Sequence, residues 1–138
     1  MRDISSLSEK MIQNIEAKRS WVRNHYAPET ISEYDTFDGK LRLLDVIIKS
    51  GWVEKTETLK LQCLGITLGD VFVQDIGFEW IEVDDEFGKD PALQMPNTSV
   101  ILFPQTMISK RMEHGEQVAI YELYDYIKQG VLNILADL

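Results

Sequence analysis

The chain is poor in the residues that build disulfides, transition-metal centres and nucleophilic sites: it has one Cys and two His among 138 residues. The single Cys63 excludes a disulfide within the chain, and between Leu61 and Leu64 we expect its thiol to behave as a small buried hydrophobe. His25 and His114 fall at the ends of predicted helices, where an imidazole binds the last carbonyls. We therefore expect no catalytic residue, no metal site and no cofactor.

Long apolar runs are also missing, and so is an excess of positive charge. No stretch approaches the roughly 18 consecutive apolar residues of a membrane helix, and the first 30 residues show no secretory signal pattern, so we expect a cytoplasmic protein. The net charge is −9, from 14 basic and 23 acidic side chains. This sign is unfavourable for binding nucleic acid or an anionic membrane surface, and we expect neither partner.

Motifs that bind phosphate, activate a serine or pair zinc ligands are absent, so we expect no enzyme. Carboxylates alternate through Asp84, Glu86 and Asp90. The glycine of this stretch is misplaced for a calcium loop, and Ala92 and Gln94 stand where further oxygen ligands would be needed. The alternation therefore does not predict a metal site.

The acidic residues gather in the middle of the chain. Residues 1–69 carry ten basic and ten acidic side chains, residues 70–90 carry one and eight, and residues 91–138 carry three and five. Such a segment is either a solvated loop or a docking surface, because acids steer a basic partner and interleaved aromatic side chains anchor it. The docking hypothesis assigns partner binding to Glu79, Trp80, Glu82, Asp84, Asp85, Glu86, Phe87 and Asp90, with Tyr34 as a further anchor.

Two adjacent cations, Lys110 and Arg111, stand out in the second half of the chain. Beside this much acid, we expect them to form structural ion pairs with Asp84, Asp85 or Asp90. A contact spot of mixed charge is the alternative.

Apolar residues recur at helical spacing in five segments: about 6–25, 37–50, 56–76, 105–113 and 118–136. Ser6 and Glu9 fit a capping box for the first helix. Gly65 and Gly69, four residues apart on the third helix, predict a closely packed neighbouring element. Trp52 is predicted to pack under the turn that ends the second helix.

The period changes to two in three short runs, about 78–83, 92–95 and 98–103, which predicts an antiparallel meander. Residues 84–90 are the expected loop of the first hairpin, and Pro96 with Asn97 forms the second turn. We expect one α+β domain over residues 1–138, with an N-terminal helical part (1–55) and a helix-sheet-helix part (56–138). Its N-terminal helices precede a three-stranded antiparallel meander, and two C-terminal helices pack on one face of that sheet.

A series of short motifs resembles a bacterial α+β domain family of unknown function, over about residues 56–135. The motifs lie at residues 68–70, 77–80, 84–93, 103–104 and 108–111. They include a leucine-glycine pair, a tryptophan-bearing strand, a glycine-lysine/arginine-aspartate-proline turn and a serine-containing basic helix. The resemblance implies a shared scaffold that places the turn near Lys110 and Arg111, and it implies no activity.

Small acidic domains of this kind, without catalytic motifs, typically block a basic partner. The leading hypothesis is an immunity protein or inhibitor that occludes a basic bacterial toxin in the cytoplasm. One alternative is a non-catalytic adaptor that binds a peptide or protein subunit at a strand edge. A second is a metal-dependent enzyme using Glu79, Glu82 and Asp85 as ligands or acid and base. The oligomeric state is left open.

Overall fold

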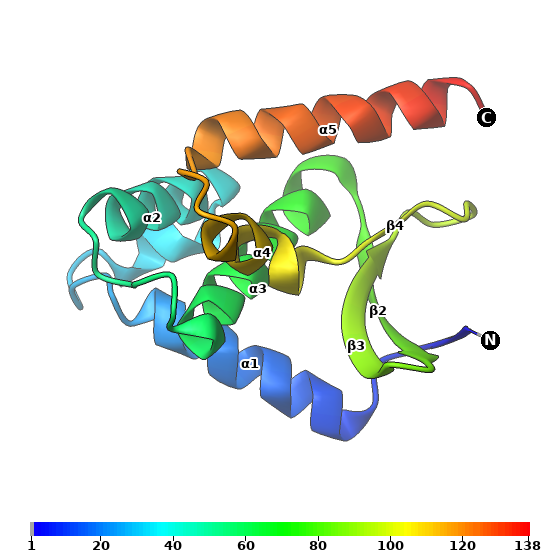
Figure 1. Cartoon of the computed structure of the whole chain (residues 1–138), viewed down its shortest axis with the longest axis horizontal. Coiled ribbons are helices and arrows are strands. Elements are labelled where there is room, and N and C mark those ends of the chain that lie inside the picture. Colours follow the sequence, from blue (N-terminus) through cyan, green and yellow to red (C-terminus); the bar gives the residue numbers. More distant parts are fainter. Residues whose placement is uncertain (1) are drawn as a thin grey trace.

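The computed structural model describes residues 2–138 and places a group of helices beside a small, twisted sheet (Figure 1). The elements follow in the order β1 (Asp3–Ser5), α1 (Glu9–Arg23), a 3-10 helix (Ile31–Asp35), α2 (Phe37–Lys49), α3 (Thr58–Ile76), β2 (Glu79–Asp85), β3 (Gly88–Gln94), β4 (Ile101–Leu102), a second 3-10 helix (Pro104–Thr106), α4 (Met107–Glu113) and α5 (Ile120–Ala136). Over residues 2–138, no helix combines the length and the apolar character needed to cross a membrane. The predicted α+β class is confirmed.

The sheet has four antiparallel strands in the order β1-β2-β3-β4, one more than predicted. The additional strand is β1, which pairs with residues 82–84 of β2. β1 has only three residues, all of them exposed, and this is too short for a period of two to be recognised in the sequence. The third strand of the predicted meander is shorter than expected, because residues 95–100 form the turn that contains Asn97 at φ 63°.

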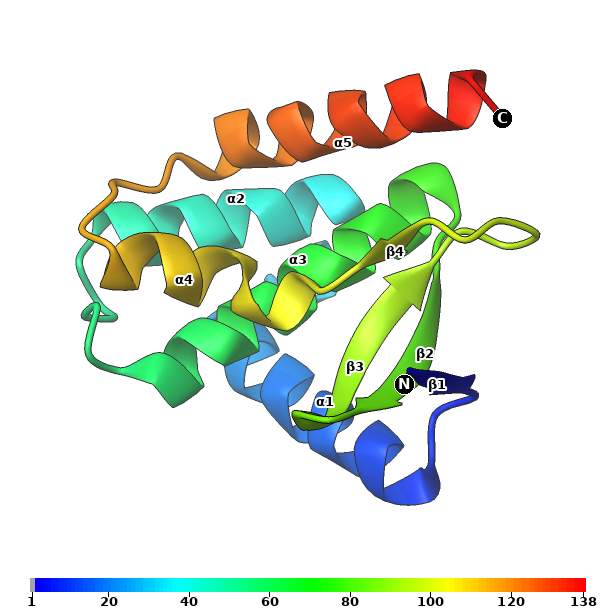
Figure 2. The same cartoon turned by 45° about the vertical axis from the view of Figure 1, so that its right-hand side comes forward.

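α3 is the central helix, and α1, α2, α4 and the second 3-10 helix pack around it (Figure 2). The close packing predicted at Gly65 and Gly69 is confirmed. A Cβ at Gly65 would lie 2.5 Å from the carbonyl oxygens of Pro104 and Gln105, and a Cβ at Gly69 would lie 2.6 Å from the Trp80 ring. α5 packs on α2, so the two C-terminal helices contact chiefly other helices rather than a face of the sheet.

The first helix begins later than predicted. Ser8, and not Ser6, caps α1, and its hydroxyl oxygen accepts a hydrogen bond from the Met11 amide at 3.2 Å. The same hydroxyl donates to the Glu82 carboxylate at 2.8 Å. The helix therefore does not include the residues before Ser8, and residues 3–5 join the sheet as β1.

Trp52, predicted to pack under the turn that ends the second helix, is exposed, and so are several apolar side chains of the helical patterns, among them Leu59, Tyr121 and Ile134. Trp52 stacks at the surface on His25, with ring centroids 6.3 Å apart. Leu59 lies in the first turn of α3. On α5 the buried residues are Ile120, Leu123, Tyr124 and Val131.

Candidate functional site

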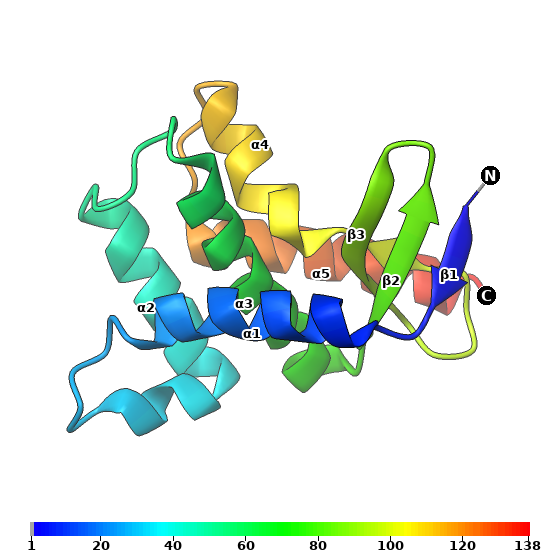
Figure 3. The same cartoon turned by 90° about the horizontal axis from the view of Figure 1, so that it is seen from below.

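The β2–β3 hairpin ends in a short turn at its free end (Figure 3), and this turn carries the aromatic residue Phe87. Phe87 is 86% exposed, more than any other large apolar side chain described. Its amide donates to Oδ1 of Asp85 at 2.9 Å, and Gly88 follows with φ 111°. These contacts hold the turn in a defined shape, because the aspartate accepts the amide and the glycine adopts a φ that other residues rarely tolerate. We call residues 84–89 the hairpin tip.

The hairpin tip is tighter than the loop predicted over residues 84–90. Asp85 pairs with Gly88, so only Glu86 and Phe87 connect the two strands. β3 begins at Gly88, and Lys89, Asp90 and Pro91 are strand residues rather than part of a turn. β4 pairs only with Leu93 and Gln94 and does not extend to Pro91. The missing N–H of Pro91 therefore interrupts no hydrogen bond to β4.

Carboxylates surround Phe87 at the hairpin tip. Asp84 and Glu86 are exposed and Asp85 is half-buried. Strand pairing also brings Asp3 of β1 opposite Asp84, while Lys89 lies opposite Asp84 on the other side. β1 thus adds a carboxylate that the linear charge pattern does not associate with this surface. The hairpin tip and Asp3 together carry four acids and one base.

Two residues assigned to partner binding have structural roles instead. Glu82 is 5% exposed, and its Oε1 accepts hydrogen bonds from the Ser8 amide and hydroxyl at 3.2 and 2.8 Å. These bonds lower the pKa of Glu82 and join β2 to α1. Trp80 is half-buried against Gly69, and its Nε1 donates to Oδ1 of Asp70 at 2.9 Å.

Tyr34, the third predicted anchor, is 3% exposed, and its hydroxyl shares a 2.7 Å hydrogen bond with Thr67. It belongs to the core. Alternation along β2 could not assign Trp80, because this strand has apolar residues on both of its faces.

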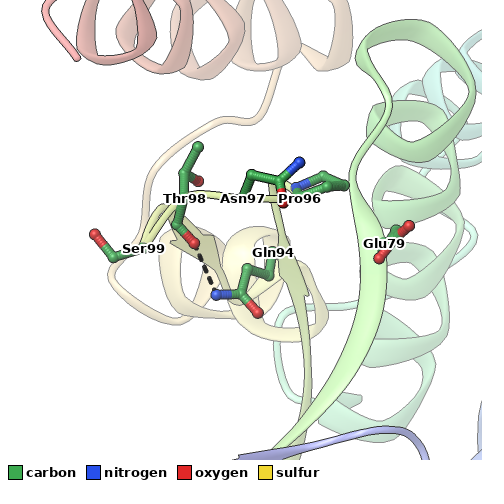
Figure 4. A pocket seen from close by; sticks show the side chains of 6 residues that line it. All are labelled: Glu79, Gln94, Pro96, Asn97, Thr98 and Ser99. Atoms are coloured by element: carbon green, nitrogen blue, oxygen red, sulfur yellow. Dashed lines mark hydrogen bonds between the residues drawn. The ribbon is translucent and has the colours of Figure 1, made fainter.

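Glu79 lies at the opposite end of β2 from the hairpin tip. It borders a polar hollow of about 610 Å³ whose other lining residues are Gln94, Pro96, Asn97, Thr98 and Ser99 (Figure 4). Six residue steps along a strand separate Glu79 from Asp85 by roughly 20 Å. Glu82 projects from the other face of β2, so the three carboxylates of the enzyme hypothesis do not form one site.

The expected ion pairs of Lys110 and Arg111 are wrong for the described part of the chain, where neither residue has a carboxylate oxygen within 4.0 Å. Arg111 instead donates to the Met107 carbonyl within α4 at 2.9 Å. Lys110 is exposed and shares a small hollow with Asp90 and Pro91. The neighbourhood implied by the resemblance is therefore present, without the direct pairing.

The histidines and the cysteine have the local roles predicted for them. Nδ1 of His25 lies 2.9 Å from the Trp21 carbonyl, and Nδ1 of His114 lies 2.6 Å from the Lys110 carbonyl. Cys63 is buried, and burial raises the pKa of its thiol. Within residues 2–138, no three His, Cys, Asp or Glu side chains are grouped as metal ligands would be.

A polar network around α3 was missed by sequence reasoning. Arg19 of α1 donates to both carboxylate oxygens of Asp70, at 2.6 and 2.8 Å. Burial disfavours the charged guanidinium, but the bonds to Asp70 outweigh that effect, so the pKa of Arg19 is raised. Lys40 of α2 is 6% exposed beside the same network. In the sequence, the only sign of this network is a charged residue within the apolar stripe of each helix. That sign does not identify the residue with which each charge pairs.

The chain is similar in fold to a protein from Bacteroides thetaiotaomicron VPI-5482 whose crystal structure was determined at 1.50 Å. The TM-score is 0.72 at 17% sequence identity, so the similarity concerns the fold alone. The match covers 90% of this chain and 46% of the other, so the chain spans about half the length of that protein chain. No curated protein matches the sequence.

The family comparison matches residues 40–124, more than half of the chain, to a family described as a domain of unknown function. The match begins in α2, earlier than the resemblance over residues 56–135 suggested, and it confirms the prediction of a family without an assigned function. The chain belongs to the DUF3806 family.

Proposed function

We propose that the protein is a non-catalytic binding protein that inserts the hairpin tip into a basic protein partner. The observation that carries this proposal is Phe87, a phenylalanine left 86% exposed at the end of a hairpin. An aromatic ring in solvent contributes nothing to folding, but it is a strong anchor once a partner pocket desolvates it.

The shape of the hairpin tip supports the same function. Phe87 lies in a two-residue connection, and its amide is bound by Asp85. A side chain presented on an ordered turn loses little conformational entropy on docking, and this preorganisation raises affinity. The ring would act as the central contact, with the acidic side chains forming a polar rim around it.

The charge pattern supports a partner that is basic. Asp3, Asp84, Asp85 and Glu86 surround the ring, and the whole chain carries a net charge of −9. Negative charge around an anchor accelerates encounter with a positive surface and disfavours acidic competitors. Among binding proteins of this charge and size, the proposal favours an immunity protein or inhibitor that occludes a basic toxin domain in the cytoplasm of a bacterium.

The two alternatives have less support. An adaptor that captures a peptide by strand addition needs a free edge, and the edge strands β1 and β4 have only three and two residues. The carboxylate enzyme would need Glu79, Glu82 and Asp85 in one place, and they lie at different ends and faces of β2.

Two variants test the proposal on binding kinetics, with the partner recovered from the source cells by the wild-type protein. The triple variant Asp84→Asn, Asp85→Asn, Glu86→Gln keeps the acceptor for the Phe87 amide and removes three charges. It should slow association about tenfold and weaken its salt dependence. Phe87→Ala should instead accelerate dissociation, by about 30-fold for an anchor contributing about 2 kcal/mol.

A matched control changes the net charge equally at exposed positions elsewhere: Glu116→Gln, Glu122→Gln, Asp125→Asn. This control should leave both rate constants within about twofold. Equal effects of the two triple variants would show that only the overall charge matters. Unchanged dissociation of Phe87→Ala would remove the hairpin tip from the interface.

A further inference from the structure

A second feature, separate from the hairpin tip, is a cavity with a buried cation that lacks a counter-ion. The cavity has a volume of about 260 Å³ and lies between α1, α2 and α3. Its lining includes three cations, Arg19, Arg23 and Lys40, and two carboxylates, Asp35 and Asp70. This local excess of positive charge contrasts with the net charge of −9 of the whole chain.

Lys40 is the unusual member of this group. It is only 6% exposed, and Nζ donates to Oε1 of Gln74 at 2.6 Å and lies 4.7 Å from the centroid of the Tyr34 ring. Over residues 2–138, no carboxylate oxygen lies within 4.0 Å of Nζ. Burial lowers the pKa of the ammonium, as expected for a cation removed from water without an ion pair.

The carboxylates of Asp70 and Asp35 partly offset the charge of Lys40 from a distance, but neither forms a direct ion pair with it. Asp70 accepts two hydrogen bonds from Arg19 and one from Trp80, so it is committed to α1 and β2. Asp35 is exposed, and its backbone carbonyl, rather than its carboxylate, accepts from Gln74 at 2.7 Å. Buried charges in proteins are normally paired, so an anion from outside the chain would complete the arrangement.

Arg23 provides a second group able to bind such an anion. Its guanidinium carbon lies 6.0 Å from the same Tyr34 ring, and its contact with Glu16 is long, at 3.4 Å. The Glu16 carboxylate is shared with Arg19, which it contacts at 2.9 Å. Arg23 therefore has donors to spare, and guanidinium groups suit carboxylate and phosphate oxygens.

We propose that this cavity binds a small oxyanion, the carboxylate or phosphate group of a small molecule, between Lys40 and Arg23. Gln74 orients the ammonium, because its amide is fixed at its other end by the Asp35 carbonyl. Tyr34 lies within 4.7 Å of Lys40 Nζ and 6.0 Å of the Arg23 guanidinium carbon, measured to the ring centroid, and Thr67 holds the phenol in place. The volume of about 260 Å³ admits a compact anion.

The test is a titration of the full chain with inorganic phosphate and, separately, with malonate, at constant ionic strength. Calorimetry should give a dissociation constant in the millimolar range or tighter, and NMR should show shifts of the side-chain signals of Arg23 and Gln74. Binding of phosphate alone, or of malonate alone, supports the site and assigns the preferred group. No binding of either probe up to about 50 mM would overturn the proposal.

Variants establish where the anion binds. Arg23→Gln, at a partly exposed position, should weaken affinity about tenfold or more, and Lys40→Met should abolish binding. Lys10→Gln removes one positive charge from an exposed position in another part of α1 and should retain affinity within about twofold. Unchanged affinity of Arg23→Gln would overturn the site, and this result can be read even if Lys40→Met does not fold.

Discussion

Gly65 and Gly69 are the residues that allow α3 to be the centre of the helical part. At both positions a side chain would overlap a neighbour from the second half of the chain, so the absence of a Cβ brings those segments close. The four-residue spacing in the sequence predicted this packing, because two small residues on one face of a helix leave room for a neighbour. It did not identify the neighbours, which are backbone oxygens at Gly65 and the Trp80 ring at Gly69.

Substitution of Gly65 tests this packing directly. Gly65→Ala should lower the free energy of unfolding by about 1–3 kcal/mol, because its methyl group would meet two carbonyl oxygens that belong to backbone and cannot rotate away. The matched control is Gly130→Ala in α5, where nothing lies within 4 Å of the added Cβ. It should raise stability by about 0.5–1 kcal/mol through helix propensity. Urea denaturation measures both changes, and equal effects would contradict the packing.

Other residues show where sequence reasoning fails at this scale. Trp80 and Glu82 belong to the acidic, aromatic segment, yet each is used inside the molecule, by Asp70 and by Ser8. Their partners lie 10 and 74 positions away, and nothing in the local pattern indicates them. The docking hypothesis named Phe87 as an anchor, but the sequence pattern did not decide between core and surface for its ring, which the structure leaves exposed.

Among the elements, helices were the easiest to predict, and short strands were the hardest. α2, α3 and α5 have apolar stripes several turns long, so their periodicity is clear and their ends are close to those expected. β1 and β4 have three and two residues, fewer than a period-two pattern needs to be recognised. Their pairing depends on tertiary contacts, such as that between Ser8 and Glu82, rather than on propensity.

The attachment of α5 to α3 is an element-scale feature that pH can probe. Oδ2 of Asp75 accepts hydrogen bonds from Tyr124 at 2.5 Å and from Lys128 at 2.8 Å. Burial acts to raise the pKa of Asp75, but the bonds to Lys128 and Tyr124 outweigh it, so the pKa is lower than usual. The ionised carboxylate is therefore more favourable in the folded chain than in the unfolded chain.

Asp75→Asn should lower the free energy of unfolding at pH 7 by about 1.5–3 kcal/mol, because a charged partner of two hydrogen bonds is lost. A carboxyl with a lowered folded-state pKa contributes fully above its unfolded pKa of about 4, and the contribution disappears as the pH falls through the lower, folded-state value. The difference between wild type and variant should accordingly shrink below about pH 4. Denaturation curves from pH 3 to 7 measure it.

The control for this experiment is Asp125→Asn, which removes the same charge from an exposed position on α5. It should change stability by less than about 0.5 kcal/mol at any pH in the series. A difference for Asp75→Asn that stays constant down to pH 3 would contradict the role of the ionised carboxylate.

For the whole molecule, the charge distribution has a clear spatial form. The acidic segment of the sequence does not stay together, because β2 carries Glu79 to one end of the sheet and Asp85 to the other. What remains at the hairpin tip is a smaller group, reinforced by Asp3 from the start of the chain. The sequence shows the local excess of negative charge. Only the fold shows that the acidic side chains are divided between the two ends of β2.

The same scale explains why the Lys40 cavity could not be predicted. Its lining residues come from α1, the 3-10 helix, α2 and α3, and no two of the three cations belong to one motif. A cation within an apolar stripe suggests burial, but it does not identify the residues that surround it. Only the packing of three helices shows that Lys40 is buried without a carboxylate partner.

The central claim is that Phe87 is the point of contact with a basic partner, and site-specific photocrosslinking in the source cells tests it most directly. A benzophenone side chain replaces Phe87 in one protein and Tyr126 in another, since Tyr126 is a similarly exposed aromatic residue on α5, at 76%. We predict one dominant adduct with a basic protein from position 87 and none from position 126. Loss of that adduct is expected in the variant that neutralises Asp84, Asp85 and Glu86. No adduct from position 87, or the same adducts from both positions, would contradict the account.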